Sequence, residues 1–376
     1  MRIAQVAPLW EPVPPTGYGG IELVVGLLTD ELVRRGHQVT LFASGDSHTL
    51  ARLEAVVPQA VRLNPAISAA AAEKIQLDRV RSLASQFDLV HFHNWVPPFE
   101  LTESLGIPTL YTLHGPLTPE FSELCSRYRH HNFISISDAQ RPANLDLNYI
   151  RTIHNGIDPE RYPFKAAAEN RESHCEGAAA DMPGGTIASD RPYLAFLGRL
   201  SPEKGPHHAI AIAQRTGLPL KLAGKVDEID RAFFEQAVLP HLDGHAIEYL
   251  GEVDHASKIT LLSDAVATLF PITWEEPFGL IMIESMATGT PVIAMNRGSV
   301  PEVIVSGKTG FICNSFDQMA EAVLKVDSLN RRNCRELVMR HFSAGRMVDK
   351  YEAAYRKVLD KQRLLPTYAP IPAVSL

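Results

Sequence analysis

Short apolar runs with the composition of β-strands alternate with helical segments along most of the chain. Residues 2–7 form the first such run, and a Pro-rich loop then leads into a helix with leucines on one face. Gly36 marks the end of that helix, and residues 38–42 are the next strand. A strand, a helix and a second strand in this order predict a βαβ unit. The chain is therefore restricted to the α/β class with parallel sheets.

The same alternation continues in both halves of the chain. Further strands are predicted at residues 89–92, 109–113, 133–136, 150–153, 193–197, 220–223, 247–250, 267–270 and 292–293. A chain of 376 residues is longer than one hydrophobic core usually supports, so we expect two domains. Residues 166–190 are rich in Ala, Gly and Ser and lack an apolar period, which predicts a mobile insertion between the domains.

Composition excludes several classes of protein. No apolar run is long enough to cross a bilayer, and the first residues look like a strand rather than a signal peptide, so we expect a cytoplasmic protein. Cys125, Cys175, Cys313 and Cys334 lack metal-site spacing and are expected to be reduced. The net charge of −7 gives no support to nucleic-acid binding. Acidic residues outnumber basic ones in the first 160 positions, so docking on anionic lipid has no support either.

Residues 275–293 predict a loop, a helix, a turn and a strand. A Pro-Phe-Gly turn opens an apolar run with helical spacing, and Gly289-Thr-Pro ends it. Backbone N–H groups around Gly279 and Leu280 would lie at the positive end of the helix dipole, which suits a phosphate. Glu276 before the helix and Glu284 inside it would then face neutral hydroxyl groups. The alternative is a buried amphipathic helix with one solvated Glu and one Glu favoured by the dipole.

A second cationic loop follows the predicted strand at 193–197. It reads Gly-Arg-Leu-Ser-Pro-Glu-Lys-Gly from Gly198 and leads into a helix. Arg199 and Lys204 can there neutralise a diphosphate leaving group without a metal ion. The chain contains no Asp-x-Asp pair, which agrees with departure assisted by cations rather than Mg²⁺. The alternative is a pair of surface charges beside a helix start.

The first domain offers glycines and histidines at strand ends, where open parallel sheets bind ligands. Residues 16–22 read Thr-Gly-Tyr-Gly-Gly-Ile-Glu, with Gly19 and Gly20 at the start of a helix. This string is not the G-x-G-x-x-G of a dinucleotide site, and the loop before it is too long for one. His93 with Asn94 and His114 follow two other strands, and a lone His is more often a hydrogen-bonded structural residue than a catalyst.

The spacing of Glu276 and Glu284 around the Pro-Phe-Gly turn resembles the E-x7-E signature of family 4 glycosyltransferases, the retaining nucleotide-sugar enzymes of the GT-B fold. The 198–205 loop is a second match, and Asn155-Gly-Ile-Asp resembles the family's interdomain hinge. The resemblance implies two facing Rossmann-like domains, with a C-terminal helix crossing back onto the first. The expected divisions are an N-terminal acceptor domain (1–160), a linker (161–190), a nucleotide-sugar domain (191–341), the crossing helix (342–364) and a tail (365–376).

The resemblance also implies roles for single residues. Arg199, Lys204 and the helix start at Gly279 and Leu280 would stabilise the diphosphate. Glu276 and His114 would hold sugar hydroxyls, and Glu284 the ribose. Gly19 and Gly20 would let the backbone approach the diphosphate, while Gly198 and Phe278 complete the donor site. His93 and Asn94 are candidates for contact with the acceptor. No metal or other cofactor is expected.

The resemblance leaves the substrates and some alternatives open. The donor is expected to be a nucleoside diphosphate sugar, with UDP favoured, and the acceptor a hydroxyl of a small or lipid-linked molecule. A GT-B nucleotide-sugar epimerase, a non-catalytic nucleotide-sugar sensor and an NAD oxidoreductase are the other functions that the same residues allow.

Overall fold

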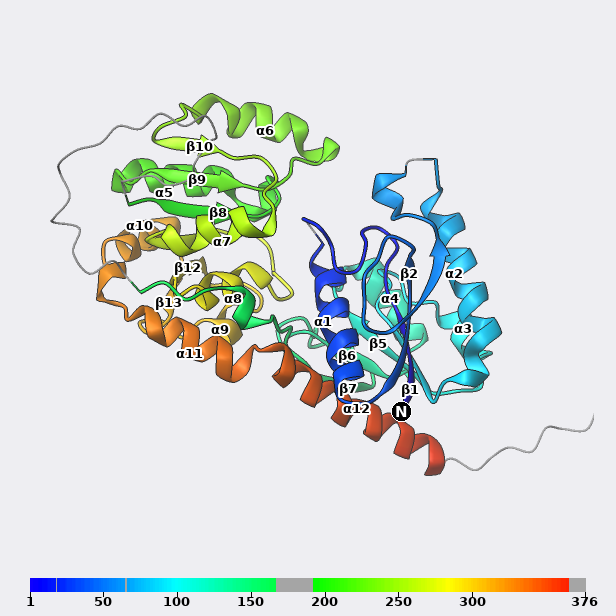
Figure 1. The fold of residues 1–376 in the computed structure, drawn as a ribbon. Coiled ribbons are helices and arrows are strands. Elements are labelled where there is room, and N and C mark those ends of the chain that lie inside the picture. Colours follow the sequence, from blue (N-terminus) through cyan, green and yellow to red (C-terminus); the bar gives the residue numbers. More distant parts are fainter. Residues whose placement is uncertain (18, 65, 167–191, 365–376) are drawn as a thin grey trace, which may run out of the picture.

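The computed structural model describes residues 1–17, 19–64, 66–166 and 192–364. Nearly all of the insertion predicted over 166–190, and the tail from residue 365, lie outside the described residues. Two α/β domains face each other, each built on one parallel sheet with helices on both faces (Figure 1). The predicted α/β class and two-domain organisation are confirmed.

The first domain contains a seven-stranded sheet in the order β3-β2-β1-β4-β5-β6-β7. Its strands are β1 (Arg2–Val6), β2 (Gln38–Ser44), β3 (Arg52–Val57), β4 (Leu89–Phe92), β5 (Thr109–Leu113), β6 (Phe133–Ser135) and β7 (Tyr149–Thr152). Its helices are α1 (Gly20–Arg34), α2 (Ala69–Leu83), α3 (Phe99–Glu103) and α4 (Pro119–Arg127). β3 was not predicted, because it lies at the sheet edge and carries charged residues at alternate positions, Arg52 and Glu54.

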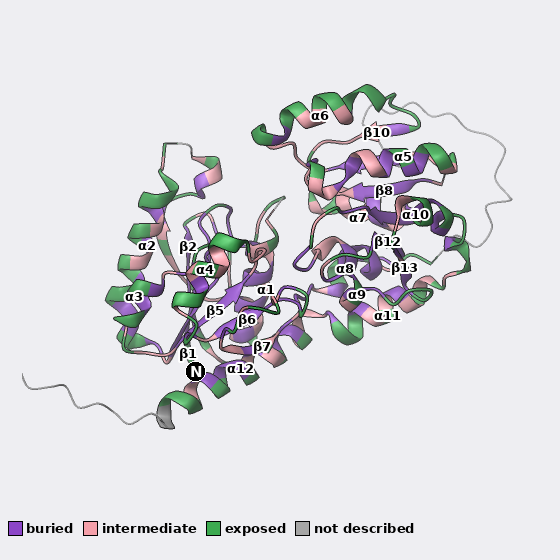
Figure 2. Cartoon of the chain, turned by 180° about the vertical axis from the view of Figure 1, so that it is seen from behind, coloured by how far each residue is buried: buried purple, intermediate pink, exposed green. Residues whose placement is uncertain are grey.

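The second domain contains a six-stranded sheet in the order β10-β9-β8-β11-β12-β13. Its strands are β8 (Leu194–Leu197), β9 (Leu220–Ala223), β10 (Ile247–Tyr249), β11 (Ala267–Phe270), β12 (Val292–Met295) and β13 (Gly310–Cys313). Its helices are α5 (Pro206–Thr216), α6 (Arg231–Ala237), α7 (His255–Asp264), α8 (Leu280–Ala287), α9 (Val300–Val303), α10 (Phe316–Val323) and α11 (Arg331–His341). The central strands are buried on both faces, as parallel sheets require (Figure 2).

The last helix, α12 (Ala344–Leu364), leaves the second domain and runs along the first (Figure 1). Its Tyr351 and Tyr355 are fully buried in one cluster with Ile3 and Leu28. The predicted crossing helix is thus confirmed. Its sequence is amphipathic, and only the face toward the first domain is buried (Figure 2).

The chain passes between the domains twice, and the two passages lie side by side. The Ile157 N–H donates to the Phe342 carbonyl at 2.9 Å, and the Ala344 N–H donates to the Ile157 carbonyl at 2.7 Å. A Cβ on Gly156 would come within 2.8 Å of the Ser343 carbonyl oxygen, so glycine is needed for this close approach. The Asn-Gly-Ile-Asp string expected at the hinge therefore lies at the hinge.

Candidate active site

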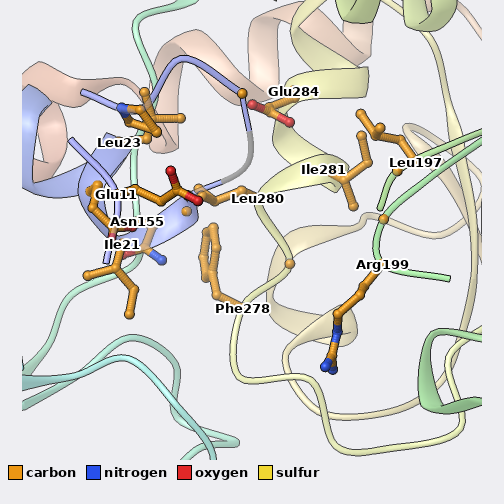
Figure 3. Close-up of a pocket in the computed structure, with 18 of the residues that line it drawn as sticks. Glu11, Ile21, Leu23, Asn155, Leu197, Arg199, Phe278, Leu280, Ile281 and Glu284 are labelled. Atoms are coloured by element: carbon orange, nitrogen blue, oxygen red, sulfur yellow. The ribbon is translucent and has the colours of Figure 1, made fainter. Parts of the chain in front are cut away.

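A cavity of about 510 Å³ lies between the two domains and is lined by both. Figure 3 shows Glu11 and Ile21 of the first domain on one side, Leu197 and Arg199 of the second on the other, and Phe278 and Leu280 between them. Much of its lining comes from residues that follow β1, β5, β8, β9, β10 and β11, beyond the carboxyl ends of those strands. This is where parallel α/β sheets bind ligands.

Two helix N-termini meet at the cavity. α1 starts after Gly19 and α8 after Gly279, and neither start is capped by a side chain. A Cβ on Gly20 would lie 3.2 Å from Leu280 Cδ1, so the two helix starts are adjacent across the domain boundary. The first N–H groups of a helix have no partner within the helix and carry partial positive charge. The structure thus brings Gly19, Gly20, Gly279 and Leu280 together, as anion binding requires.

Lys204 also lines the cavity, where its ammonium group is paired with Glu276. Lys204 Nζ lies 2.5 Å from Glu276 Oε2, which also accepts a 3.0 Å hydrogen bond from Trp274 Nε1. Glu276 is only 8% exposed, so the lysine compensates a buried negative charge. Sequence reasoning placed both residues at the site but did not foresee that they pair with each other.

Arg199 lies on the loop after β8, next to Gly198, and both line the cavity. The guanidinium is bonded to Glu203 and lies 3.7 Å from Asp227 and 3.8 Å from Asp230. This acidic surround was not predicted. A ligand phosphate would have to share the guanidinium with these carboxylates or displace them. Arg199 is therefore less available to a ligand than the loop sequence indicates.

Glu284 lies one turn inside α8 and contacts two groups that the sequence did not single out. Lys258 Nζ of α7 donates to Glu284 Oε1 at 2.6 Å, and the Tyr162 hydroxyl donates to the same oxygen at 2.7 Å. Burial raises the pKa of Glu284, but the Lys258 charge and both hydrogen bonds outweigh burial and hold the pKa below its ordinary value. Glu284 is therefore an anion at neutral pH, and it lines the cavity.

The histidines after β4 and β5 occupy different positions relative to the cavity. His114 lines it, and the removal of water from around the ring lowers its pKa to about 3, so His114 is neutral at pH 7. His93 is fully buried behind His114, with both ring nitrogens hydrogen-bonded. Asn94 is 8% exposed and donates to Glu73 and Gln76. Neither His93 nor Asn94 lines the cavity, so the expected acceptor contacts are not supported by the structure.

Two buried carboxyl groups of the first domain line the cavity and escaped sequence reasoning. Glu11 and Glu22 are 4% and 5% exposed. Arg62 Nη1 donates to Glu11 at 2.6 Å, and its Nη2 donates to Glu252 of the second domain at 3.0 Å, so this arginine bridges the domains. Burial, with a contribution from the Glu11 charge, raises the pKa of Glu22 to about 7. The one feature of the sequence that could have indicated a role for Glu22 is its position in the first turn of α1.

Gly298 supports the Glu276 loop and provides a test of it. Its φ of +52° lies in the left-handed region, and an added Cβ would come 2.3 Å from Glu276 O and 2.4 Å from Glu276 N. Gly307 has φ +76° with nothing within 4 Å, so it is a matched control for backbone strain alone. We expect Gly298→Ala to destabilise the protein by about 1–3 kcal/mol more than Gly307→Ala in urea unfolding. An equal loss of stability in the two variants would show that the Glu276 backbone can move away from the added Cβ at little cost in free energy.

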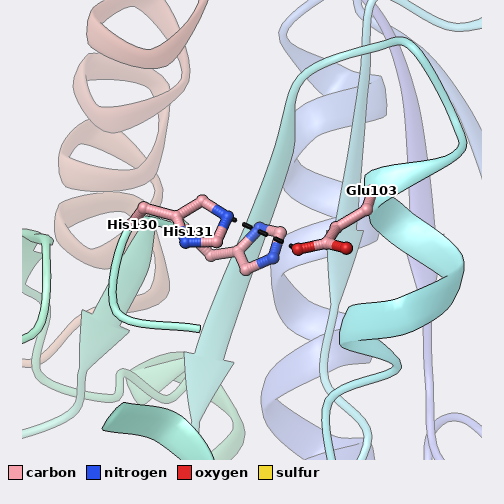
Figure 4. A group of neighbouring side chains, drawn as sticks. All are labelled: Glu103, His130 and His131. Atoms are coloured by element: carbon pink, nitrogen blue, oxygen red, sulfur yellow. Dashed lines mark ion pairs between the residues drawn. The ribbon is translucent and has the colours of Figure 1, made fainter. Parts of the chain in front are cut away.

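Three potential metal ligands gather outside the cavity lining (Figure 4). His130 Nε2 lies 3.7 Å from Glu103 Oε1, and both side chains are more than half exposed. The His131 ring instead stacks on Phe99, and burial lowers its pKa to about 4. Among the described residues this is the one group of its kind. The exposed His130–Glu103 pair and the stacking of His131 on Phe99 explain why the three side chains lie close together, without a metal ion.

None of the helices in the described part of the chain combines the length and the apolar composition needed to cross a bilayer.

Two protein families and many individual proteins resemble this chain. The family model for glycosyl transferases group 1 matches residues 179–338, and that for glycosyltransferase family 4 matches residues 18–161. A glycogen synthase of Mycobacterium tuberculosis (strain H37Rv) is 28% identical over 381 residues, covering 84% of this chain and 83% of that protein.

Solved glycosyltransferases share the fold. The glycosyltransferase AviGT4, involved in avilamycin A biosynthesis, superposes with a TM-score of 0.66 at 23% identity, covering 96% of this chain and 98% of that one. Anabaena Alr3699/HepE in complex with UDP and glucose superposes with a TM-score of 0.70 at 19% identity, covering 95% and 100%. Because the two family models match the two facing domains in order, and the fold agrees throughout, the chain belongs to glycosyltransferase family 4 and has the GT-B fold.

Proposed function

We propose that the protein transfers a sugar from a nucleoside diphosphate sugar, with UDP favoured, to a hydroxyl acceptor, and that the anomeric configuration is retained. The observation that carries the proposal is the convergence of two uncapped helix starts with Arg199 and Lys204 on one cavity. Partial and full positive charges from both domains point to a ligand with several negative charges. A diphosphate between the domains meets that requirement.

The groups around this positive region fit the rest of a donor molecule. Glu276 and His114 are proposed to hold sugar hydroxyls, and Glu284 to hold the ribose. Asn155 adds a buried Oδ1 without a partner among the described residues, and Asn155 lines the same cavity. A buried unpartnered acceptor is costly, and a ligand hydroxyl would satisfy it. The solved Alr3699/HepE complex with UDP and glucose, which shares this fold, supports UDP as the nucleotide.

The proposed reaction forms one bond to the anomeric carbon and breaks another. The acceptor oxygen attacks from the face that the diphosphate leaves, and the departing phosphate oxygen takes the acceptor's proton. Arg199, Lys204 and the amide groups at the start of α8 stabilise the charge on the leaving group, which is the basis for proposing that no metal is needed. Glu11 is paired with Arg62, and Glu22 has a raised pKa, so neither is a free anion suited to a double displacement.

A thermal-shift comparison of UDP, GDP and ADP, followed by a turnover assay with sugar nucleotides of the best base, tests the proposal. A ligand at 100 times its Kd adds about 2.7 kcal/mol to the stability of the folded state, so at least one nucleotide should raise the melting temperature. The product's anomeric configuration, read by NMR, should match that of the donor.

The alternatives give different results in the same experiment. An epimerase would convert the donor to an isomer without an acceptor, and a sensor would bind the nucleotide without turnover. If none of the three nucleotides raised the melting temperature, the proposal of a nucleoside diphosphate sugar as donor would be wrong. The NAD oxidoreductase hypothesis would then have to be tested.

A further inference from the structure

A continuous chain of buried hydrogen bonds runs from the cavity to α12. It starts at His114, whose Nε2 lies 2.9 Å from His93 Nδ1. His93 Nε2 lies 2.9 Å from Gln5 Oε1, and Gln5 Nε2 donates to the Tyr355 hydroxyl at 2.9 Å. Tyr355 lies 2.8 Å from His91 Nδ1, which connects through Thr112 to Tyr351. Gln5, His91, His93 and both tyrosines are fully buried, so water does not compete for these bonds.

The Gln5 amide determines the direction of this chain. Its oxygen can only accept and its nitrogen can only donate. Because Gln5 Oε1 faces His93 Nε2, that nitrogen must carry a proton and donate it. His93 is neutral, since burial holds its pKa well below the ordinary value, so its Nδ1 has a lone pair and accepts. His114 Nε2 is then the donor, and His114 Nδ1 is left without a proton.

His114 Nδ1 is the free end of the chain. It has no hydrogen-bond partner among the described residues, and it is not one of the fully buried unpartnered atoms, so it is open to the cavity that His114 lines. A neutral ring in this tautomer presents a lone pair there. It accepts a hydrogen bond from a hydroxyl group and has no proton to donate.

We propose that Gln5 is a positioning residue, whose amide fixes His93 and through it His114 so that His114 Nδ1 faces the substrate as a hydrogen-bond acceptor. The proposal of a sugar hydroxyl as the partner rests on the proposed function. The tautomer itself rests on the hydrogen bonds and on the neutrality of the buried His93 ring, and not on the proposed function. The opposite amide orientation would reverse every bond in the chain and would turn His114 Nδ1 into a donor.

Nitrogen-15 NMR of the full-length protein with labelled histidine reads this tautomer directly, because protonated and unprotonated ring nitrogens resonate far apart. His114→Gln identifies the signals of His114. We expect His114 to be protonated at Nε2 and unprotonated at Nδ1 in the free wild-type protein. Protonation at Nδ1 would overturn the proposal.

Two substitutions at Gln5 separate its hydrogen-bonding role from its packing role. Gln5→Met keeps the length of the side chain but removes the acceptor, so both tautomers of His114 should become populated. In Gln5→Glu a carboxyl oxygen still accepts from His93 Nε2, whether or not the carboxyl is ionised, so the wild-type tautomer should persist. An unchanged tautomer in Gln5→Met would contradict the role of Gln5. If Gln5→Met fails to fold, the tautomer of His114 in the wild-type protein and in Gln5→Glu still tests the proposal.

Tyr355→Phe provides the matched control on the other side of Gln5. The substitution removes the hydrogen bond from Gln5 to α12 and leaves Gln5 Oε1 facing His93. We therefore expect the wild-type tautomer of His114. Loss of that tautomer would contradict the proposal that Gln5 determines it.

The activity readout is separate from the NMR result. With a working donor, kcat/KM should fall about ten-fold in Gln5→Met and recover in Gln5→Glu, as the loss and return of one hydrogen bond imply. If no donor is turned over, the proposed function fails, while the tautomer result in the free protein stands by itself.

Discussion

Lys204→Ala is expected to lower kcat by about 10²–10³, as the loss of one charge-stabilising group at a leaving group does in other enzymes. Lys204 lines the cavity together with the α8 start, and its ammonium group contacts Glu276, so we expect that group to stabilise the charge that develops on the diphosphate. The effect should fall on kcat more than on KM, because the leaving group gains negative charge in the transition state. Steady-state kinetics with a saturating acceptor measures this.

The structure also predicts a stability cost that the sequence did not indicate. Removing Lys204 leaves the carboxylate of Glu276, which is 8% exposed, with the Trp274 indole as its remaining hydrogen-bond donor among the described residues. We expect a loss of about 1–3 kcal/mol in urea unfolding. Lys308→Ala removes an exposed cation outside the cavity and should leave both quantities unchanged. Near-normal turnover in Lys204→Ala and in Arg199→Ala together would remove the diphosphate assignment.

Glu22→Gln is expected to stabilise the protein at alkaline pH and to have little effect at acid pH. In the folded state burial raises the pKa of Glu22 to about 7, against an ordinary value of 4.5. The folded state therefore holds a proton that the unfolded state has lost, and wild-type stability falls as pH rises between these two values. Glutamine does not titrate, so the variant should gain about 3 kcal/mol over the wild type above pH 7.

Urea unfolding at pH 4 and at pH 8 provides the measurement for Glu22→Gln. The gain should be present at pH 8 and absent at pH 4. Glu120→Gln changes a fully exposed carboxyl and should show no comparable gain at pH 8. A gain of equal size at both pH values would show that Glu22 acts through packing and not through its charge.

The sequence predicts most strands of the fold because each combines an apolar run with a following glycine or polar turn. β4, β5, β9 and β11 have the predicted bounds. β3 was missed, since an edge strand with alternating charges lacks that signal. β13 was also missed as a strand, because it begins with glycine, which is depleted in strands.

The candidate site was predictable where it depends on the local sequence and not where it depends on distant contacts. The turn before α8 and the loop after β8 place Gly279, Arg199 and Lys204 at one cavity, as their local patterns indicate. The pairing of Lys258 with Glu284 joins residues of different helices, and the hydrogen bond of Gln5 to Tyr355 joins opposite ends of the chain. No spacing in the sequence encodes such contacts. For the same reason, sequence alone did not show that His93 lies behind His114.

The return of α12 makes the first domain discontinuous in sequence. Tyr351, Tyr355 and four other α12 residues complete a core whose remaining buried members come from the first 160 residues. A fragment that stops at the hinge would therefore expose Ile3, Leu28 and their neighbours to water, and it should aggregate or stay unfolded when it is expressed alone. During synthesis the first domain must wait for α12, so its core is completed only after the strands of the second domain have been made.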